Sequence, residues 1–213
     1  MGILKYKPTS GYTRLVERGK LGMATLDFGI LNLEVGDSFF ENTADNQALL
    51  IVLSGQCTLL VGHNGNKAHG IIGERPNVFA DAAYRVYIPC RTTYEVFADD
   101  VPVEVAICKV PDALDTAALI LEPGDEPNTP NYAVIASETV TPSFAGEAIG
   151  LYRFQQEEGY IHQRIYNDDS SFNQCIALHH NDILALPLGY QAEVVGTHDS
   201  PAYCLQLTAR DAR

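Results

Sequence analysis

The sequence contains few basic residues. Its 14 Lys and Arg residues stand against 27 Asp and Glu residues, which gives a formal net charge of -13. Proteins that bind nucleic acids or anionic membrane surfaces gain affinity from Lys and Arg side chains that neutralise phosphates. The composition therefore argues against nucleic acid and membrane partners.

Long hydrophobic runs are absent as well. No stretch approaches the roughly 18 apolar residues of a membrane helix, and the first residues, MGILKYKPTSGYTRL, lack the apolar segment of a secretory signal. The five cysteines are odd in number, widely spaced and without a CxxC pair, which favours reduced, buried thiols over disulfides or a zinc knuckle. We expect a cytoplasmic protein.

Helical periodicity is weak throughout, and only PDALDTAALI (111 to 120) suggests a turn or two of helix. Short apolar runs separated by turn residues dominate instead. ALLIVLSG leads into QCTLLVGHNGNKAHGII, where Asn64-Gly65 is a strong hairpin signal between two strands. Proline and glycine are spread along the chain, so disorder is not expected. The pattern predicts an all-β protein.

An internal repeat sharpens this prediction. The segments VYIPCRTTYEVFADDVPVEVAI (86 to 107) and LALPLGYQAEVVGTHDSPAYCL (184 to 205) each end an apolar strand in Pro89 or Pro187. Glu95 and Glu193 follow their prolines by the same interval (95 − 89 = 6; 193 − 187 = 6). The repeat predicts two tandem barrels, at residues 1–120 and 132–213, joined by a linker at 121–131.

The pattern of an apolar strand, Pro-x-Gly and a following ligand position resembles the second conserved motif of the cupin barrels. The stretch from Gly159 to Leu207 is similar to the carboxy-terminal half of the 5-deoxy-glucuronate isomerases of myo-inositol catabolism. The matching residues are Gly159, Gln163, Arg164, Tyr166, Asp168, Asp182, Pro187, Gly189 and Tyr190. The resemblance implies two cupin-like, double-stranded β-helix (jelly-roll) barrels, with a divalent metal in the second.

In that family the metal is held by a His-x-His pair, a glutamate and a histidine on a Gly-Tyr-His turn, and it would polarise the carbonyl of an open-chain uronate. This chain has only SFAG (143 to 146) where the family carries the His-x-His segment, so its second barrel is shortened. Ala148 stands at the glutamate position and Gln191 at the last histidine. Glu147 is adjacent to Ala148, but successive strand side chains point to opposite faces.

The remaining histidines offer no obvious replacement. His179-His180 sits where a turn is expected, and no pair has ligand spacing on one strand face. We therefore expect no cofactor. A divalent metal of the zinc, manganese, iron or nickel type is expected only if the chain is an active isomerase that borrows ligands from elsewhere.

A sugar-acid pocket is the alternative use of the second barrel. Tyr152, Arg164, Tyr166, Tyr190 and Gln191 could line it, with the guanidinium holding a carboxylate and the phenols holding sugar hydroxyls. Arg164 could equally brace the barrel while the tyrosines fill space. Because Ala148 and Gly150 are small, a cavity remains beside them unless neighbours fill it.

Two hypotheses follow. The first is a metal-free homologue that binds a sugar acid or has a structural or regulatory role. The second is an active isomerase in the same pathway that uses other acid and base residues or ligands from a neighbouring subunit. In either case the shortened second barrel leaves strand edges that must be covered, so we expect a homodimer or larger homo-oligomer.

Overall fold

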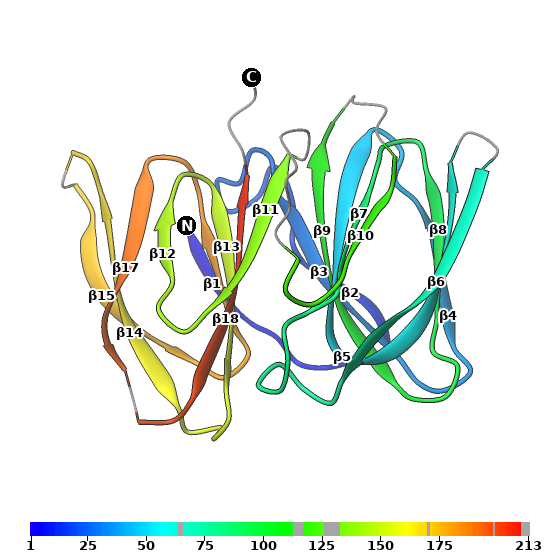
Figure 1. The fold of residues 1–213 in the computed structure, drawn as a ribbon. Coiled ribbons are helices and arrows are strands. Elements are labelled where there is room, and N and C mark those ends of the chain that lie inside the picture. Colours follow the sequence, from blue (N-terminus) through cyan, green and yellow to red (C-terminus); the bar gives the residue numbers. More distant parts are fainter. Residues whose placement is uncertain (64–65, 113–116, 126–132, 170, 198, 210–213) are drawn as a thin grey trace.

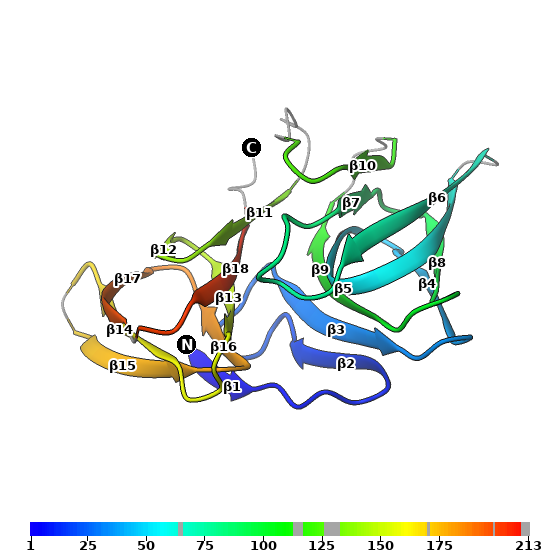
Figure 2. The same cartoon turned by 60° about the horizontal axis from the view of Figure 1, so that its bottom comes forward.

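The structure of this chain is a computed structural model. It describes residues 1–63, 66–112, 117–125, 133–169, 171–197 and 199–209. The described chain forms two β-barrels that lie side by side, each built from a larger and a smaller antiparallel sheet (Figures 1 and 2).

The first barrel contains nine strands. They are β2 (Gly11–Val16), β3 (Asp27–Leu33), β4 (Ser38–Asn42), β5 (Asn46–His63), β6 (Asn66–Arg75), β7 (Arg85–Ile88), β8 (Thr93–Phe97), β9 (Val103–Pro111) and β10 (Leu119–Leu121). The large sheet has the order β10-β7-β5-β9-β3-β2, and β6, β8 and β4 join the second half of β5 in the small sheet.

The long strand β5 passes from one sheet to the other at a bend near Gly55. The strand register shifts between Val52 and Ser54 and again between Gly55 and Gln56. Gly55 has φ +82°, and a Cβ there would lie 1.9 Å from the Pro102 carbonyl oxygen. Only glycine therefore fits at this corner of the barrel.

The second barrel repeats this arrangement with fewer residues. Its strands are β1 (Gly2–Lys5), β11 (Val134–Thr139), β12 (Ser143–Ala145), β13 (Ala148–Phe154), β14 (Tyr160–Asn167), β15 (Asn173–His179), β16 (Asp182–Leu186), β17 (Tyr190–Thr197) and β18 (Ala202–Ala209). The large sheet has the order β1-β16-β13-β18-β11 and the small sheet the order β12-β17-β14-β15.

The repeat seen in the sequence is a repeat of topology. Strands β7, β8 and β9 occupy the places in the first barrel that β16, β17 and β18 occupy in the second, with Pro89 and Pro187 at the equivalent strand ends. The all-β prediction with two tandem barrels is confirmed. The prediction that residues 1–120 belong to the first barrel is wrong at its start, because β1 pairs with β16 in the second barrel.

Three other sequence predictions concern residues outside those described. The Asn64-Gly65 turn and residues 126–131 of the expected linker lie there, although β5 and β6 pair on either side of the turn. Residues 113–116 of the expected helical turn lie there too, and the end of that segment forms strand β10. Among the described residues, no helix has the length and hydropathy needed to cross a membrane.

Alternation of side chains divides the apolar residues into three cores. Along β5, Ala48, Leu50 and Val52 point into the first barrel, whereas Leu49 and Ile51 point toward the second. Residues on β13, β16 and β18 alternate in the same way between the interior of the second barrel and the face that meets the first. The two large sheets thus share one core, which we call the seam.

Two carboxylates, one buried and one partly buried, link the two barrels across the seam. Glu147 accepts hydrogen bonds from the backbone N–H groups of Ala24, Thr25 and Leu26 at 2.8, 2.7 and 2.6 Å. These three amides satisfy the carboxylate, which has no cationic partner among the described residues. Glu147 therefore ties the turn between β12 and β13 to the segment that precedes β3.

Glu138 forms the second polar contact between the barrels. Its carboxylate accepts bonds from the Arg75 guanidinium at 2.8 Å, the Tyr203 hydroxyl at 2.8 Å and the Ala83 N–H at 2.9 Å. Arg75 comes from β6 of the first barrel and is almost completely buried. This ion pair spans the two barrels.

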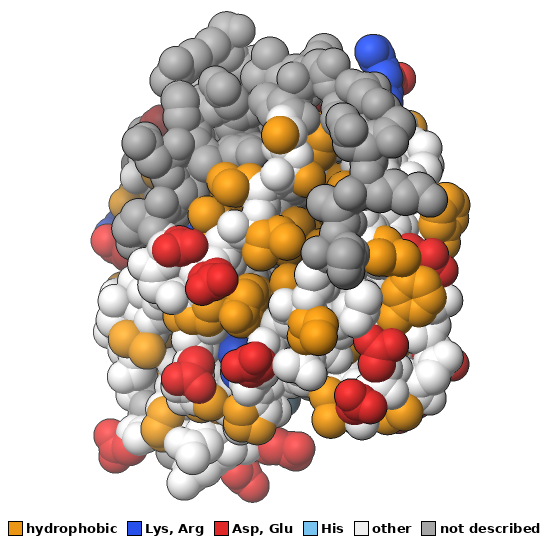
Figure 3. Space-filling view, turned by 45° about the vertical axis from the view of Figure 1, so that its right-hand side comes forward, with side chains coloured by type: hydrophobic (Ala, Val, Ile, Leu, Met, Phe, Trp, Pro, Cys, Tyr) orange, Lys and Arg blue, Asp and Glu red, His pale blue; other side chains and the backbone are white. Residues whose placement is uncertain are grey.

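Acidic side chains are spread over the face of the first barrel seen in Figure 3, and basic side chains are rare there.

In the second barrel, β15 pairs with β14 alone among the described strands and is an edge. Its seven residues, NQCIALH, include no Asp, Glu, Lys, Arg, Pro or Gly, the residues that usually protect an edge. Self-association stays a prediction, and this edge is where we would look for it.

The cysteines differ sharply in exposure, which predicts their reactivity. None of the five forms a disulfide; Cys57, Cys90, Cys108 and Cys204 are buried and Cys175 is exposed. Burial raises the pKa of the Cys57 thiol to about 12 and raises the pKa values of Cys108 and Cys204 further. Because the thiolate is the reactive form, a disulfide reagent at pH 8 should label one cysteine in the native protein and five after denaturation. Cys175→Ser should abolish the native labelling, and a second fast thiol would contradict this description.

Glu147→Gln should destabilise the protein. The amide presents N–H donors toward backbone N–H donors and removes the charge-assisted bonds, at a cost of about 1.5–3 kcal/mol in the free energy of unfolding. Urea denaturation measures the loss. Glu158→Gln, on an exposed loop, is the matched control and should change stability by less than about 0.5 kcal/mol. Equal effects of the two substitutions would show that the three amide contacts contribute nothing.

Candidate functional site

The interior of the second barrel is the place where the family resemblance puts a metal. Ala148 is fully buried there and faces the apolar core. A Cβ at the neighbouring inward position, Gly150, would lie 2.8 Å from the Phe144 ring and 2.9 Å from the Tyr152 ring. The space that two small residues would leave is therefore occupied by these aromatic rings.

Tyr152 and Gln163 supply the polar atoms of this interior and satisfy each other. The Tyr152 hydroxyl donates to the Gln163 amide oxygen at 2.5 Å, and the Gln163 amide nitrogen donates to the Pro142 carbonyl oxygen at 3.5 Å. Both side chains are buried, and burial raises the pKa of Tyr152 well above its ordinary value. The pair is a neutral internal hydrogen bond that leaves the phenol protonated.

Gln191 lies outside the barrel. On β17, Ala192 points into the core, so Gln191 points to the outer face of the small sheet. Its amide nitrogen donates to Asp168 at 2.7 Å and its amide oxygen accepts from the Tyr166 hydroxyl at 3.3 Å. Strand alternation thus aims Gln191 away from the barrel interior, where the resemblance implies the metal.

Arg164 and Tyr166 lie on the same outer face. The Arg164 guanidinium donates to Asn173 at 2.9 Å and to Glu193 at 3.2 Å, and it lies 4.7 Å from the Tyr166 ring centroid. These contacts link three strands of the small sheet. Arg164 thus braces the sheet, which was the alternative to the pocket hypothesis.

Tyr190 is the last of the predicted binding residues. Its ring meets Phe172 edge-on at 5.6 Å and packs against the interior core. The five residues therefore lie in two places. Tyr152 on the large sheet and Tyr190 on the small sheet face the barrel interior, whereas Arg164, Tyr166 and Gln191 lie on the outer side of the small sheet. They do not line one pocket.

The family metal does not fit the donors present in the second barrel. At the positions implied by the resemblance stand a buried alanine and an outward glutamine, and Glu147 is bound to three amides at the seam. His180 is held in a turn, where its Nδ1 lies 2.9 Å from the Phe154 carbonyl oxygen. Across the described residues, no group of three or more His, Cys, Asp and Glu side chains could hold a metal ion.

The first barrel differs at the equivalent position. In the strand register, Glu41 pairs with Tyr94, and the corresponding pair in the second barrel is Phe144 with Ala192. Tyr94 and Ala192 each follow the equivalent proline by five residues (94 − 89 = 5; 192 − 187 = 5). The first barrel thus has a carboxylate and a phenol at this position, where the second barrel has the apolar side chains of Phe144 and Ala192.

Glu41 and Tyr94 belong to a polar cluster at the end of the barrel where β3 begins and β9 ends. Glu41 accepts hydrogen bonds from the Tyr94 hydroxyl and the Lys109 ammonium. Lys109 lies 5.0 Å from the Tyr12 ring centroid. We call these four residues, together with the ion pair Arg14–Asp27, the mouth cluster.

The two phenols of the mouth cluster stay protonated. Burial, with the nearby Glu41 carboxylate, raises the pKa of Tyr94 well above its ordinary value. Burial, with the Asp27 and Glu41 charges, does the same for Tyr12. The Tyr12 hydroxyl lies against Gly29, where a Cβ would be 2.5 Å away. Glycine at this point of β3 allows the ring to cross the strand.

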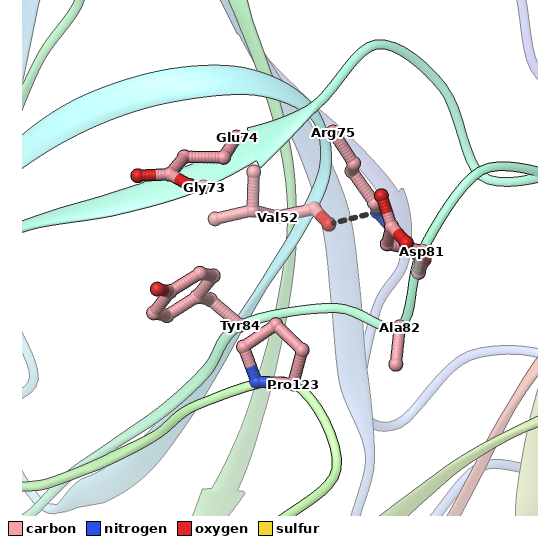
Figure 4. A pocket seen from close by; sticks show the side chains of 8 residues that line it. All are labelled: Val52, Gly73, Glu74, Arg75, Asp81, Ala82, Tyr84 and Pro123. Carbon is pink, nitrogen blue, oxygen red and sulfur yellow. Dashed lines mark hydrogen bonds between the residues drawn. The ribbon is translucent and has the colours of Figure 1, made fainter.

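A cavity lies on the first barrel beside Arg75 (Figure 4). It measures about 210 Å³ and is lined by residues that include Val52, Asp81 and Tyr84. The Arg75 guanidinium donates to the Val52 carbonyl oxygen at 3.0 Å and to the Asp81 carbonyl oxygen at 2.7 Å, in addition to Glu138. The positive charge of Arg75 is already paired with Glu138 of the second barrel. We therefore do not regard this cavity as the functional site.

Comparison with known proteins identifies the family to which this double barrel belongs. The sequence model of the KduI/IolB family matches residues 5–129 and 145–209. The chain belongs to the KduI/IolB family. The internal segment that the family model leaves unmatched, 130–144, includes the first two residues of the short SFAG stretch.

Individual proteins and solved structures are also similar to this chain, in sequence or in fold. The chain is 24% identical to a 5-deoxy-glucuronate isomerase from Geobacillus thermodenitrificans over 79% of this chain and 74% of the relative. It is 22% identical to the enzyme of that name from Listeria innocua, over 93% and 86%. An IolB-like protein from Salmonella typhimurium superposes with a TM-score of 0.82 at 20% identity, covering 99% and 93% of the two chains. Lactobacillus farciminis oxalate decarboxylase shares the double-barrel fold, with a TM-score of 0.68 at 10% identity, covering 99% and 86%.

Sequence reasoning missed the mouth cluster. The repeat had already aligned the segments that contain Tyr94 and Ala192, so the difference between the two barrels at this position was visible. Glu41, Lys109 and Tyr12 come from separate strands without a spacing motif, and only the sheet register brings them together.

Phe144→Ala should test whether the second barrel is closed by packing. Removing the ring leaves a void above Gly150 and should lower the free energy of unfolding by about 3–5 kcal/mol. Phe40→Ala is the matched control, because Phe40 is 63% exposed on the first barrel. Chemical denaturation of both variants measures the difference. Similar losses for the two would mean that Phe144 is not a packed plug.

Proposed function

We propose that this member of the KduI/IolB family binds a small sugar acid without a catalytic metal. The observation that carries the proposal is the apolar filling of the second-barrel interior, where Phe144 and Tyr152 lie over Gly150 beside Ala148. A site that holds a divalent cation needs several oxygen, nitrogen or sulfur ligands at one point, and loss of the set removes its affinity.

The ligand class rests on the relatives. Those quoted above carry the name 5-deoxy-glucuronate isomerase, and that name specifies a carboxylated sugar as substrate. Binding folds of one family commonly retain ligand chemistry while the reactive groups diverge, because function depends on a few side chains placed on the scaffold. The proposed role is recognition of such a sugar acid, as a binding or regulatory protein.

The competing function is isomerisation by residues other than the family ligands. It would use a carboxylate base and a cationic partner in place of the metal, and Glu41 with Lys109 is the described pair that could attempt it. This function predicts turnover, which the binding function does not.

The test combines metal analysis, binding and turnover on the purified chain. After dialysis against a chelator we expect substoichiometric divalent metal, unchanged melting temperature and retained binding of glucuronate. A ligand that binds only the folded protein stabilises it by about 2.7 kcal/mol at a hundredfold excess over Kd, so thermal denaturation gives a sensitive readout.

Three outcomes would overturn the proposal. One equivalent of tightly bound divalent metal, with glucuronate binding lost after its removal, would restore the family site. Turnover of 5-deoxy-glucuronate that resists the chelator would establish the competing function. Absence of binding to any uronate at high concentration would remove the sugar-acid assignment itself.

A further inference from the structure

We infer that the mouth of the first barrel is the ligand site, and that it takes a small carboxylate that carries neighbouring hydroxyl groups. The sugar-acid part of this inference rests on the proposed function. The position of the site rests on the first barrel alone, in which the mouth cluster stands at the place that Phe144 plugs in the second.

A cavity opens at this end of the barrel. It has a volume of about 310 Å³, and its lining includes Arg14, Arg18, Glu41, Asn42, Asn46 and Lys109. Ligand pockets in proteins commonly measure about 300–1,000 Å³. A cavity at the lower end of this range suits a single sugar-sized molecule better than an oligosaccharide.

The charge of the cavity favours an anion. Three of the chain's 14 Lys and Arg residues line it, against the two carboxylates of Asp27 and Glu41, in a protein of net charge -13. Arg14 is paired with Asp27 and Lys109 with Glu41. Arg18 donates to the neutral amide oxygen of Asn46 at 3.0 Å, so that contact leaves its positive charge uncompensated. A carboxylate could add to this arrangement without displacing an ion pair.

The same cavity offers groups that suit hydroxyls. The Glu41 carboxylate has two oxygens with several lone pairs, of which two are used by Tyr94 and Lys109. A lysine ammonium has three N–H donors, and Glu41 takes one of them. The side-chain amides of Asn42 and Asn46 lie on the rim. Acceptors and donors in alternation are what a polyol chain requires.

The base of the site is rigid. The Tyr12 and Phe39 rings lie 5.6 Å apart, and the Phe39 and Tyr94 rings 6.3 Å apart, so the three rings form a continuous aromatic layer beneath the charged groups. Tyr94 is fully enclosed and bonded to Glu41, which fixes the carboxylate in place. A site built on strands and packed rings loses little freedom when a ligand binds.

The larger cavity between the barrels is a weaker candidate. It measures about 830 Å³ and is lined by Val78, Phe79, Val140 and Tyr203 together with Glu138. Glu138 is already bonded to Arg75, Tyr203 and Ala83. That groove lacks an available cation among its described lining residues and has no feature that selects a carboxylate.

The experiment measures glucuronate and glucose binding to the full chain by calorimetry at low salt. Wild type should bind glucuronate at least tenfold more tightly than glucose, because glucose lacks the carboxylate. Arg18→Gln should weaken glucuronate binding about tenfold, since Arg18 is exposed and the change removes one charged donor. Lys109→Gln should weaken it further, with a thermal melt to check folding.

Arg164→Gln is the control variant. It removes a guanidinium of the same kind from the outer face of the second barrel and should leave glucuronate binding unchanged. Suppose that wild type binds glucuronate and that neither Arg18→Gln nor Lys109→Gln weakens the binding, whether or not Arg164→Gln does. The inferred position is then wrong, and the proposed function stands. If wild type binds no uronate, the proposed function fails and the inferred ligand fails with it. Equal affinity for glucose and glucuronate would overturn the recognition of a carboxylate.

Discussion

The packing of the two large sheets against each other is the constraint on which the rest of this structure depends. It requires strands such as β5, β9, β13 and β18 to be apolar on both faces, because one face lines a barrel and the other meets the partner barrel. Among the described residues, Glu147 and the Arg75–Glu138 pair are polar groups at the seam, and each makes several hydrogen bonds there. The large sheets can therefore vary little, and chemistry is confined to the barrel ends and the small sheets.

This constraint explains why Glu147 cannot act as the missing family glutamate. Side chains on a strand alternate, so residue 147 faces the seam when residue 148 faces the barrel interior. The carboxylate is used by three backbone amides of the first barrel, and moving it inward would leave those donors unpaired. The position that would need a ligand holds an alanine covered by aromatic rings.

The two barrels share one strand topology but differ in the side chains at the equivalent end. Register-equivalent pairs are Glu41 with Tyr94 in the first barrel and Phe144 with Ala192 in the second. The substitution of one inward pair turns a polar, ion-paired cavity into a closed apolar end. Membership in the KduI/IolB family thus accounts for the double barrel, whereas the chemistry of each barrel depends on the few side chains at its open end.

The sequence by itself determined the all-β class, the internal repeat with its prolines at 89 and 187, and the family. These features are local or periodic, and strand patterns and motif spacings record them directly. Only the tertiary structure decided that β1 joins the second barrel and that Arg164, Tyr166 and Gln191 lie outside it. Only the structure also brought Tyr12, Glu41, Tyr94 and Lys109 together. Sheet register and the inward or outward facing of each strand depend on pairing between distant segments, and a shift of one residue reverses them.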